Sequence, residues 1–230
     1  MNKKYLYLLI MLVLAVSCSF TGNKNDADNS RYASICPEGI NLKPMYGKVK
    51  KCKQQAESDK DFIEHCRKEF GDLKRASMEH VGMGWQYFNK GDVDTAIKRF
   101  NQAWLLDSLN ADVYWGFASV EGTRGKTDEA IKLFDKSLEL NPNNTYVWTN
   151  LATAYSNKFR EKYDVKYLDE TIKCLKKAIA LSPKNEDAYR MITIAYSHYN
   201  QKDSLKEYLK LTDQLNPDII DAETRKQLLR

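Results

Sequence analysis

Hydrophobic residues recur along this chain with the three- and four-residue spacing of an α-helix. A clear short example lies between Asp59 and Phe70, where the apolar positions are Phe62, Ile63, Cys66 and Phe70. The stretch Ser58–Asp61 resembles a capping box, which begins a helix by satisfying free backbone N–H groups. The pattern predicts a helix from about Asp59 to Phe70, inside an N-terminal capping segment at 35–76.

Four fragments of similar composition recur further along, each ending in a polar residue or in proline. They are Ala103–Ser108, Ser137–Pro142, Ala178–Pro183 and Thr212–Pro217. The first two lie 34 residues apart and so do the last two, whereas 41 residues separate the middle pair. A recurring period of this length indicates a repeat architecture. The low content of glycine and proline, 10 and 5 residues, favours long helices over a turn-rich β fold.

At this period the sequence resembles the tetratricopeptide repeat (TPR) family, whose units are helical hairpins. The family places an aromatic residue at position 4 of each unit, Leu with Gly or Ala at 7 and 8, and Tyr at 11. Ala at 20 and 27, Phe at 24 and Pro at 32 follow. The units here are 77–110, 111–144, 145–185 and 186–219. Unit two carries the pattern at Tyr114, Phe117, Ala118, Ala130, Phe134 and Pro142.

The resemblance implies an all-α fold, a right-handed α-solenoid of about four TPR hairpins with a capping helix before it and a solvating helix at 220–230. Small residues at positions 8, 20 and 27 would let two helices approach closely, with aromatic residues beside them. Gly91 and Gly125 would supply turns between helices. Unit four departs most, with Thr193 at position 8 and Leu205 at position 20. Its second helix therefore has the weakest support.

Unit three is seven residues longer than the others, and the extra residues fall within 159–168. Seven residues are about two turns of helix, so one added turn on each helix would lengthen the hairpin without rotating its buried faces. The protruding tip would carry Phe159, Tyr163 and Tyr167. These side chains either contact a partner or only pack the added turns together, and we favour the second interpretation.

Residues 1–17 have the pattern of an export signal. Two lysines precede Tyr5–Val16, an apolar run of twelve residues, which is too short to span a bilayer and suits a signal-peptide core. Ser17 and Cys18 resemble the cleavage site of bacterial lipoproteins, which implies a lipid on Cys18. Residues 18–34 are polar, which is typical of a flexible tether. The alternative is a plain secretory signal with Cys18 incidental.

Export to an oxidising compartment permits disulfide bonds. Cys174 falls in the second helix of unit three, where we expect a small buried residue. Cys36, Cys52 and Cys66 are left to pair. We favour the pair Cys52–Cys66, because its spacing suits two neighbouring helices, and expect Cys36 to stay unpaired.

Charge and motifs exclude several classes of function. The formal net charge is +5, and about +3 without Lys3 and Lys4, which is too weak a bias for binding nucleic acid. No nucleotide-binding or hydrolase motif occurs, so we expect neither enzymatic activity nor a cofactor. Cys52, His65 and Cys66 lack the paired short spacings of a structural zinc site, so we expect no metal.

In TPR arrays the first helices line a concave groove, often through positions 2, 5, 9 and 12. The resemblance therefore implies a partner-binding groove, and the candidate residues are Val81, Trp85, Phe88, Trp115, Tyr146 and Arg190. This groove would be aromatic at its N-terminal end and polar further on. The Lys and Asn clamp by which some TPR proteins hold a peptide C-terminus is missing. The alternative for Trp85 and Trp115 is burial under residues 35–70.

The implied function is that of a scaffold in the bacterial cell envelope, anchored by lipid to the outer membrane and facing the periplasm. It would bind an unidentified envelope protein or peptide without catalysing a reaction. The alternative is a lipoprotein that captures a peptide or a glycan for uptake.

Overall fold

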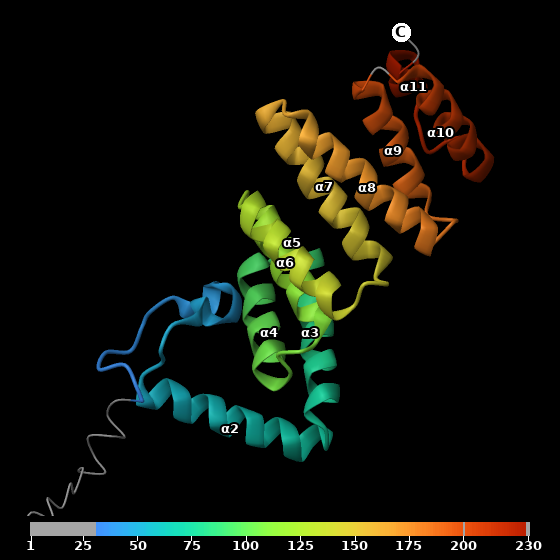
Figure 1. Cartoon of the computed structure of the whole chain (residues 1–230). Coiled ribbons are helices and arrows are strands. Elements are labelled where there is room, and N and C mark those ends of the chain that lie inside the picture. The colour runs from blue at the N-terminus through green and yellow to red at the C-terminus, as the bar shows by residue number, and fades with distance from the viewer. Residues whose placement is uncertain (1–30, 200, 229–230) are drawn as a thin grey trace, which may run out of the picture.

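The computed structural model describes residues 31–199 and 201–228. Within them the chain forms ten α-helices, two short 3₁₀ helices and no strand, so the predicted all-α fold is confirmed (Figure 1). The N-terminal elements are η1 (Ile40–Leu42), η2 (Pro44–Lys48) and α2 (Lys53–Phe70). The others are α3 (Leu73–Asn89), α4 (Val93–Leu106), α5 (Ala111–Thr123), α6 (Thr127–Leu140), α7 (Thr145–Lys162), α8 (Val165–Leu181), α9 (Glu186–His198), α10 (Lys202–Leu215) and α11 (Ala222–Leu228). The predicted signal peptide and Cys18 lie outside the described residues.

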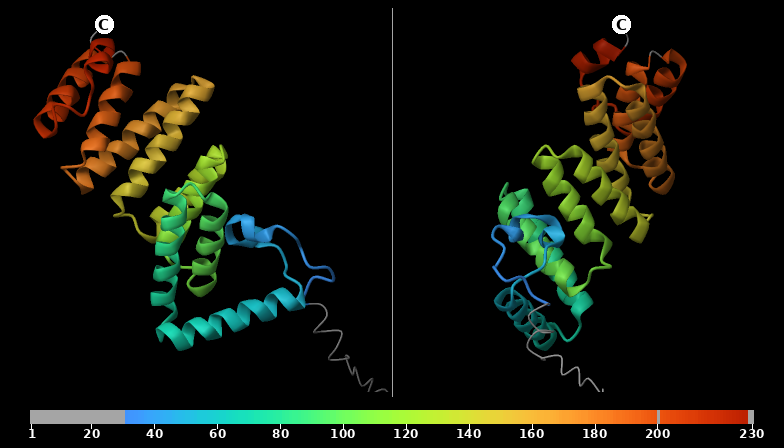
Figure 2. Two further views of the ribbon diagram at one scale, coloured as in Figure 1. Left: turned by 180° about the vertical axis from the view of Figure 1, so that it is seen from behind. Right: turned by 60° about the vertical axis from the view of Figure 1, so that its left-hand side comes forward.

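Helices α3 to α10 form four hairpins that stack one on the next into an α-solenoid (Figures 1 and 2). The pairs are α3–α4, α5–α6, α7–α8 and α9–α10, and the most extensive helix contacts are those within each pair. The first helix of each hairpin also contacts the first helix of the next one. Helices α3, α5, α7 and α9 therefore line one face of the solenoid.

Asparagine side chains both begin the first helices and link neighbouring hairpins. The side-chain oxygens of Asn110, Asn144 and Asn185 accept backbone N–H groups at the start of α5, α7 and α9, as N-cap residues do. Their Nδ2 groups donate to the first helix of the preceding hairpin. The acceptors are Ser77 Oγ at 2.9 Å, Asp112 Oδ1 at 3.4 Å and Thr149 Oγ1 at 3.4 Å.

Phe100 is fully buried where the first two hairpins meet. Gly84 of α3 and Gly116 of α5 lie against its ring. A Cβ atom on either glycine would come within 2.4 Å of Phe100 Cε1. The repeat pattern predicts a small residue at Gly84, but it does not predict Gly116. Both hairpins can approach the ring this closely because neither glycine has a side chain.

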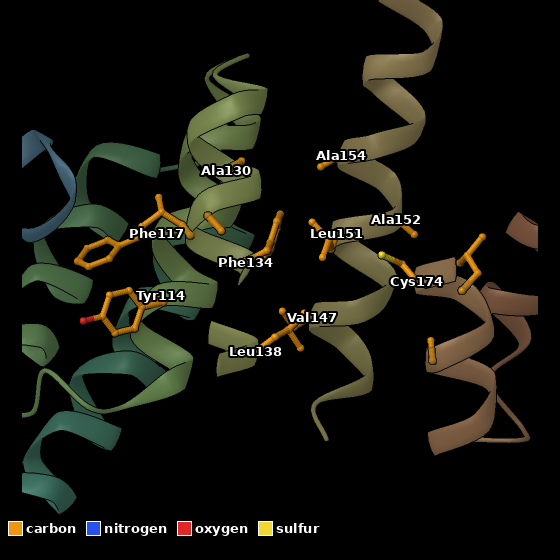
Figure 3. Close-up of a cluster of buried hydrophobic side chains, with 14 of the residues drawn as sticks. Tyr114, Phe117, Ala130, Phe134, Leu138, Val147, Leu151, Ala152, Ala154 and Cys174 are labelled. Carbon is orange, nitrogen blue, oxygen red and sulfur yellow. The ribbon is translucent and has the colours of Figure 1, made fainter. Parts of the chain in front are cut away.

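The second and third hairpins meet through aliphatic and aromatic side chains. Figure 3 shows Phe134 and Leu138 of α6 facing Leu151 and Val147 of α7, and all four are buried. Cys174 of α8 lies on the other side of α7 and is buried as predicted. Burial raises the pKa of its thiol to about 12, so Cys174 is a protonated core residue at neutral pH.

The third hairpin is longer than the second, as predicted. Helices α7 and α8 have 18 and 17 residues, against 13 and 14 in α5 and α6. Phe159 packs on His198 with ring centroids 5.6 Å apart, and two lysine ammonium groups lie over the ring of Tyr167. Tyr167 therefore joins the added turns of α7 and α8, whereas Phe159 contacts the fourth hairpin. Tyr163, at the tip, is 82% exposed.

The fourth hairpin forms despite its departures from the repeat pattern. Thr193 and Thr212 are buried, and their hydroxyl oxygens lie 3.0 Å apart in a hydrogen bond. Leu205 is buried beside them in the core of the repeat. Helix α11 is held to α10 by Arg225, which donates to both carboxylate oxygens of Asp213 at 2.8 and 2.6 Å.

Helix α2 begins at Lys53, six residues before the predicted start. Ser58 therefore lies inside the helix, where its hydroxyl donates to the carbonyl oxygen of Gln54, and the predicted capping box is wrong. The helix is capped instead by Cys52 and Gln55. The backbone N–H of Cys52 donates to Gln55 Oε1 at 3.3 Å.

Only the C-terminal half of α2 packs on the solenoid, at one end of the first hairpin (Figure 1). Cys66 is 1% exposed and clusters there with Ala76 and Leu106. His80 is buried, and its ring and that of Phe62 meet edge to face with centroids 5.3 Å apart. This half of α2 covers the apolar end that the first hairpin would otherwise expose.

The disulfide bond joins Cys36 to Cys52, so both the predicted pair Cys52–Cys66 and the unpaired Cys36 are wrong. Cys52 and Cys66 stand at the start and near the end of one continuous helix, about 21 Å apart at 1.5 Å per residue. A disulfide needs Cα atoms within about 7 Å of each other. Cys66 is instead a buried free thiol.

Residues 31–51, which we call the strap, lie against α4 (Figure 2). Asn101 of α4 is fully buried beneath the strap. Its Oδ1 accepts the backbone N–H of Tyr46 at 3.2 Å, and its Nδ2 donates to the carbonyl oxygens of Asn41 and Lys43, both at 2.9 Å. One side chain thus uses both donors and an acceptor to hold the strap in place.

Candidate partner-binding groove

Three aromatic side chains from successive first helices form a continuous row. The ring centroids of Trp85 in α3 and Trp115 in α5 lie 4.5 Å apart. Tyr146 of α7 stacks on Trp115 at 5.9 Å with an interplanar angle of 10°. We call Trp85, Trp115 and Tyr146 the aromatic row. Phe88 meets the edge of Trp85 at 5.4 Å, so aromatic surface covers the first helices of three hairpins.

A cavity of about 350 Å³ lies beside Trp85, and we call it the groove. Trp85 and Phe88 form its aromatic wall. Ala118, Ala130 and Ala154, all buried, are part of the lining. Ala118 and Ala130 stand at positions 8 and 20 of unit two, so the small residues that let the hairpin close also make room for the groove. None of the residues that line it is charged.

The polar residues of the groove are hydroxyls and amides. The hydroxyls of Ser119, Thr123 and Thr153 each donate to a backbone carbonyl oxygen four residues earlier, which leaves their lone pairs to accept hydrogen bonds. The side chain of Asn150 makes no hydrogen bond with the described residues, so its amide can donate and accept. The groove therefore suits an uncharged polar ligand, such as a peptide backbone, that also carries an apolar group.

The indole N–H of Trp115 is buried and has no hydrogen-bond acceptor among the described residues. An unmatched buried donor costs roughly 1–3 kcal/mol. Trp148, by comparison, donates from Nε1 to the carbonyl oxygen of Pro142 at 2.8 Å. The two tryptophans therefore differ in whether the described residues supply an acceptor for the indole N–H.

Asp112 lies in the first turn of α5, one turn before Trp115, and is partly buried. Burial raises the pKa of its carboxyl group, an effect that the hydrogen bond from Asn144 opposes. Among the described residues Asp112 belongs to no ion pair. Asp187 has the same position in unit four, but its carboxylate lies 3.7 Å from the Arg190 guanidinium.

The six predicted groove residues have different environments. Trp85 and Phe88 line the groove, and Trp115 and Tyr146 complete the aromatic row. Val81 is only 7% exposed and belongs to the buried cluster around Phe100, so the prediction that it faces the groove is wrong. Arg190 lies on α9, is paired with Asp187 and does not line the groove.

The alternative in which residues 35–70 bury the two tryptophans is also wrong. The strap lies against α4, and α2 packs at the end of the first hairpin. The ring contacts of Trp85 are with Phe88, Phe100 and Trp115. The aromatic row therefore keeps a face that no N-terminal element covers.

A second cleft, of about 630 Å³, was not predicted from the sequence. It lies between the strap and the second helices of units one and two. Apolar residues that include Met45, Trp104 and Leu133 line it together with charged residues such as Glu129 and Lys132. The strap reaches it through a left-handed turn at Met45–Lys48, with φ between 53° and 68°. Only Gly47 in that turn signals such a conformation in the sequence.

Among the described residues, no group of three or more His, Cys, Asp or Glu side chains is arranged to hold a metal ion. None of the described helices combines the length and the apolar composition needed to cross a membrane.

Two family models match the chain, and both describe a tetratricopeptide repeat. One covers residues 111–144, the predicted second unit, and the other covers residues 133–163. The chain contains tetratricopeptide repeats. TPR repeats form scaffolds that bind proteins or peptides, and their stacked hairpins give extended concave surfaces. The chain is therefore a scaffold for protein–protein interaction.

Several solved structures share the fold at low sequence identity. PilF of Pseudomonas aeruginosa is 20% identical with a TM-score of 0.60, over 68% of this chain and 69% of PilF. A thermophilic TPR protein of Thermus thermophilus is 19% identical, TM-score 0.53, over 61% and 75%. MamA of Desulfovibrio magneticus RS-1 is 15% identical, TM-score 0.54, over 66% and 89%. None of the curated proteins matches the sequence.

Proposed function

We propose that this TPR protein is a lipid-anchored adaptor of the bacterial cell envelope. It binds a segment of another protein in the groove and along the aromatic row, and catalyses no reaction. The observation that carries this proposal is the uncovered aromatic surface across three hairpins, next to a groove without charge. Desolvated aromatic residues supply much of the affinity in protein interfaces.

The groove favours an extended polypeptide for two reasons. Its apolar volume accepts one side chain beside Trp85 and Phe88. The hydroxyls of α5 and the amide of Asn150 offer acceptors and donors at intervals along the helices, which suits the alternating N–H and C=O groups of a peptide. An interface of this kind gains affinity from a few anchors rather than from its whole area.

The absence of catalysis is proposed from the chemistry of the lining. A serine or threonine nucleophile needs a base within hydrogen-bond reach. The hydroxyls of Ser119, Thr123 and Thr153 instead donate to backbone carbonyl oxygens. No charged or imidazole side chain lines the groove, so nothing there could accept a proton from them.

The envelope location is proposed from the first 18 residues and from the Cys36–Cys52 disulfide. Disulfides persist in exported proteins and are rare in the cytosol. A lipid on Cys18 would place the solenoid at the end of the polar segment 19–34, on the periplasmic side of the outer membrane. Cells labelled with a clickable fatty acid should tag the wild-type protein and not Cys18→Ala, and a label that survives the substitution would refute the anchor.

A glycan is the second candidate ligand, because an uncharged lining of hydroxyls and amides beside an indole ring also suits a sugar. Photo-crosslinking distinguishes the two. With a benzophenone amino acid at Thr123, in the groove, we expect a discrete adduct in cells that protease digestion of the partner removes. The same probe at Lys173, an exposed residue of α8, should give no such adduct. An adduct sensitive to glycosidases alone would support the uptake role, and equal yields from both positions would contradict the groove.

A further inference from the structure

Asp112 has no cationic partner among the described residues, although the first turn of α5 offers it the partial positive charge of a helix N-terminus. It is partly buried and accepts one hydrogen bond, from Asn144 Nδ2 at 3.4 Å. None of the ion pairs of the described residues includes it. Removing a carboxylate from water without a partner cation is unfavourable, so a cation supplied from outside the chain would be stabilised here.

The fourth unit shows how this repeat provides a cation when none comes from a partner. There Asp187 stands at position 2 and Arg190 at position 5, and the two form an ion pair. In unit two, position 5 is Trp115 instead. The second unit therefore has the acidic half of the same pair, with an aromatic ring where the fourth unit has its guanidinium.

The rings beside Asp112 are suited to a cation. Tyr146 is 68% exposed and stacks on Trp115, which follows Asp112 by one turn of α5. Ammonium and guanidinium groups are attracted to the faces of tryptophan and tyrosine rings within about 6 Å. Trp115 is flanked by Trp85 and Tyr146, so the exposed ring is that of Tyr146. This ring and the carboxylate of Asp112 would together bind the head of a lysine or arginine side chain.

We propose that Asp112, Trp115 and Tyr146 bind a lysine or arginine residue of the partner segment, and that an apolar residue of the same segment enters the groove. This inference rests on the proposed function, since it assumes that a polypeptide is the ligand. It adds the chemical class of that polypeptide, which is basic and apolar rather than acidic.

The geometry also sets the spacing of the two partner residues. Asp112 and Ser119, which lines the groove, are seven residues apart on α5, or about 10 Å at 1.5 Å per residue. A peptide in the polyproline II conformation advances about 3.1 Å per residue and completes one turn every three residues, so side chains three positions apart share a face. The basic residue and the apolar residue should therefore be about three positions apart in the partner.

The test uses the purified full-length chain and a positional-scanning library of nonapeptides blocked at both ends, read by fluorescence polarisation. We expect wild-type protein to select aromatic or aliphatic residues at one position and Lys or Arg about three positions away. Replacing the selected basic residue with norleucine should weaken binding about tenfold. Raising the salt concentration should weaken the basic peptide more than its norleucine counterpart, because exposed charge pairs are screened.

Three variants complete the experiment. Asp112→Asn should lose the preference for Lys and Arg but keep the apolar preference, and Asp112→Lys should select Asp or Glu instead. Asp187→Asn is the matched control, since its carboxylate already has Arg190 as a partner, and it should behave as wild type. Circular dichroism melts check that each variant is folded, and the salt comparison on wild type does not depend on any variant.

The outcomes separate this inference from the function on which it rests. Apolar selection without a basic preference, or a basic preference that persists in Asp112→Asn, overturns the cation site and leaves the peptide groove standing. No selection at any position overturns peptide binding in the groove, and the cation site with it.

Discussion

The second and fourth hairpins are built on the same repeat but present different chemistry on their first helices. In α9 the charges of Asp187 and Arg190 balance each other. The aromatic rings of that hairpin pack inside it, with Tyr196 and Tyr208 stacked at 5.2 Å. In α5, Asp112 has no cation, and the indole N–H of Trp115 has no acceptor among the described residues.

In these two hairpins the packed core and the proposed binding surface therefore use different positions of the repeat. Both hairpins fill their small and aromatic core positions in a compatible way, so both fold. They differ at positions 2 and 5, where the fourth unit has an ion pair and the second has a carboxylate without a partner cation and an indole ring. Unsatisfied polar groups at these positions lower stability, and a partner that satisfies them recovers that energy on binding.

The largest expected effect is on stability. It tests whether core contacts between the first two hairpins contribute more to the unfolding free energy than core contacts in the last hairpin. Phe100→Ala removes a fully buried ring between two hairpins and should cost about 3–5 kcal/mol of unfolding free energy. Leu209→Ala, in the terminal hairpin, should cost nearer to about 2 kcal/mol. Urea titrations followed by circular dichroism measure both unfolding free energies. A larger loss of stability in Leu209→Ala than in Phe100→Ala would contradict this order.

Trp115→Ala should affect binding more than folding. A desolvated aromatic anchor contributes about 2 kcal/mol or more, which is roughly a thirtyfold loss of affinity. The control is Trp148→Ala, because Trp148 has its hydrogen bond to Pro142 and should cost stability without weakening binding. Melting temperature and peptide affinity are measured on the same samples. If Trp115→Ala lost binding only in proportion to its unfolded fraction, Trp115 would be a core residue.

Two glycines of α5 should respond oppositely to alanine. In Gly116→Ala the new Cβ would meet the Phe100 ring at 2.4 Å, so overpacking should cost about 1–3 kcal/mol. In Gly122→Ala the nearest atom is Ala130 Cβ at 3.8 Å, and the better helix propensity of alanine should leave stability unchanged or raised by up to about 1 kcal/mol. Thermal melts of both variants test this prediction. Equal melting temperatures would contradict the close approach of Gly116 to the Phe100 ring.

The smallest effect concerns pH. Burial raises the pKa of Asp112 in the folded state, so folding favours its protonated form, and its destabilising contribution appears as the pH rises through the folded-state pKa. Arg225 lowers the pKa of Asp213, so the stability from that pair is lost as the pH falls through the folded-state pKa. At pH 7, Asp112→Asn should be as stable as wild type or slightly more so, whereas Asp213→Asn should lose less than about 1 kcal/mol. If Asp112→Asn were instead less stable than wild type at pH 7, other groups in the folded chain would compensate the charge of Asp112.

Much of the fold could be predicted because the repeat period constrains many residues at once. The hairpins, the added turns of unit three and the burial of Cys174 all follow from periodicity. The disulfide did not follow, because Cys52 and Cys66 could be paired only if the helix began after Ser58. The cap at Cys52 and Gln55 extended the helix, which placed both cysteines on one rigid element.

The site could be predicted only in part, for a related reason. Positions taken from a repeat indicate which face a residue occupies but not how its neighbours cover it. Trp85 and Phe88 face the groove as expected, but Val81 is enclosed in the cluster that contains Phe100. The role of Asn101 carries no local signal, because its partners in the strap lie 55 to 60 residues away in sequence.

The Cys36–Cys52 bond has a mechanical consequence. It bridges the segment between the two cysteines, so a pull arriving from the N-terminal side crosses from Cys36 directly to Cys52 and enters α2. The left-handed turn at Met45–Lys48 and the backbone groups held by Asn101 lie inside the bridged loop and carry no tension. A force applied at the N-terminus would thus leave the strap bound to α4. Once the disulfide is reduced, the segment between Cys36 and Cys52 would carry that force.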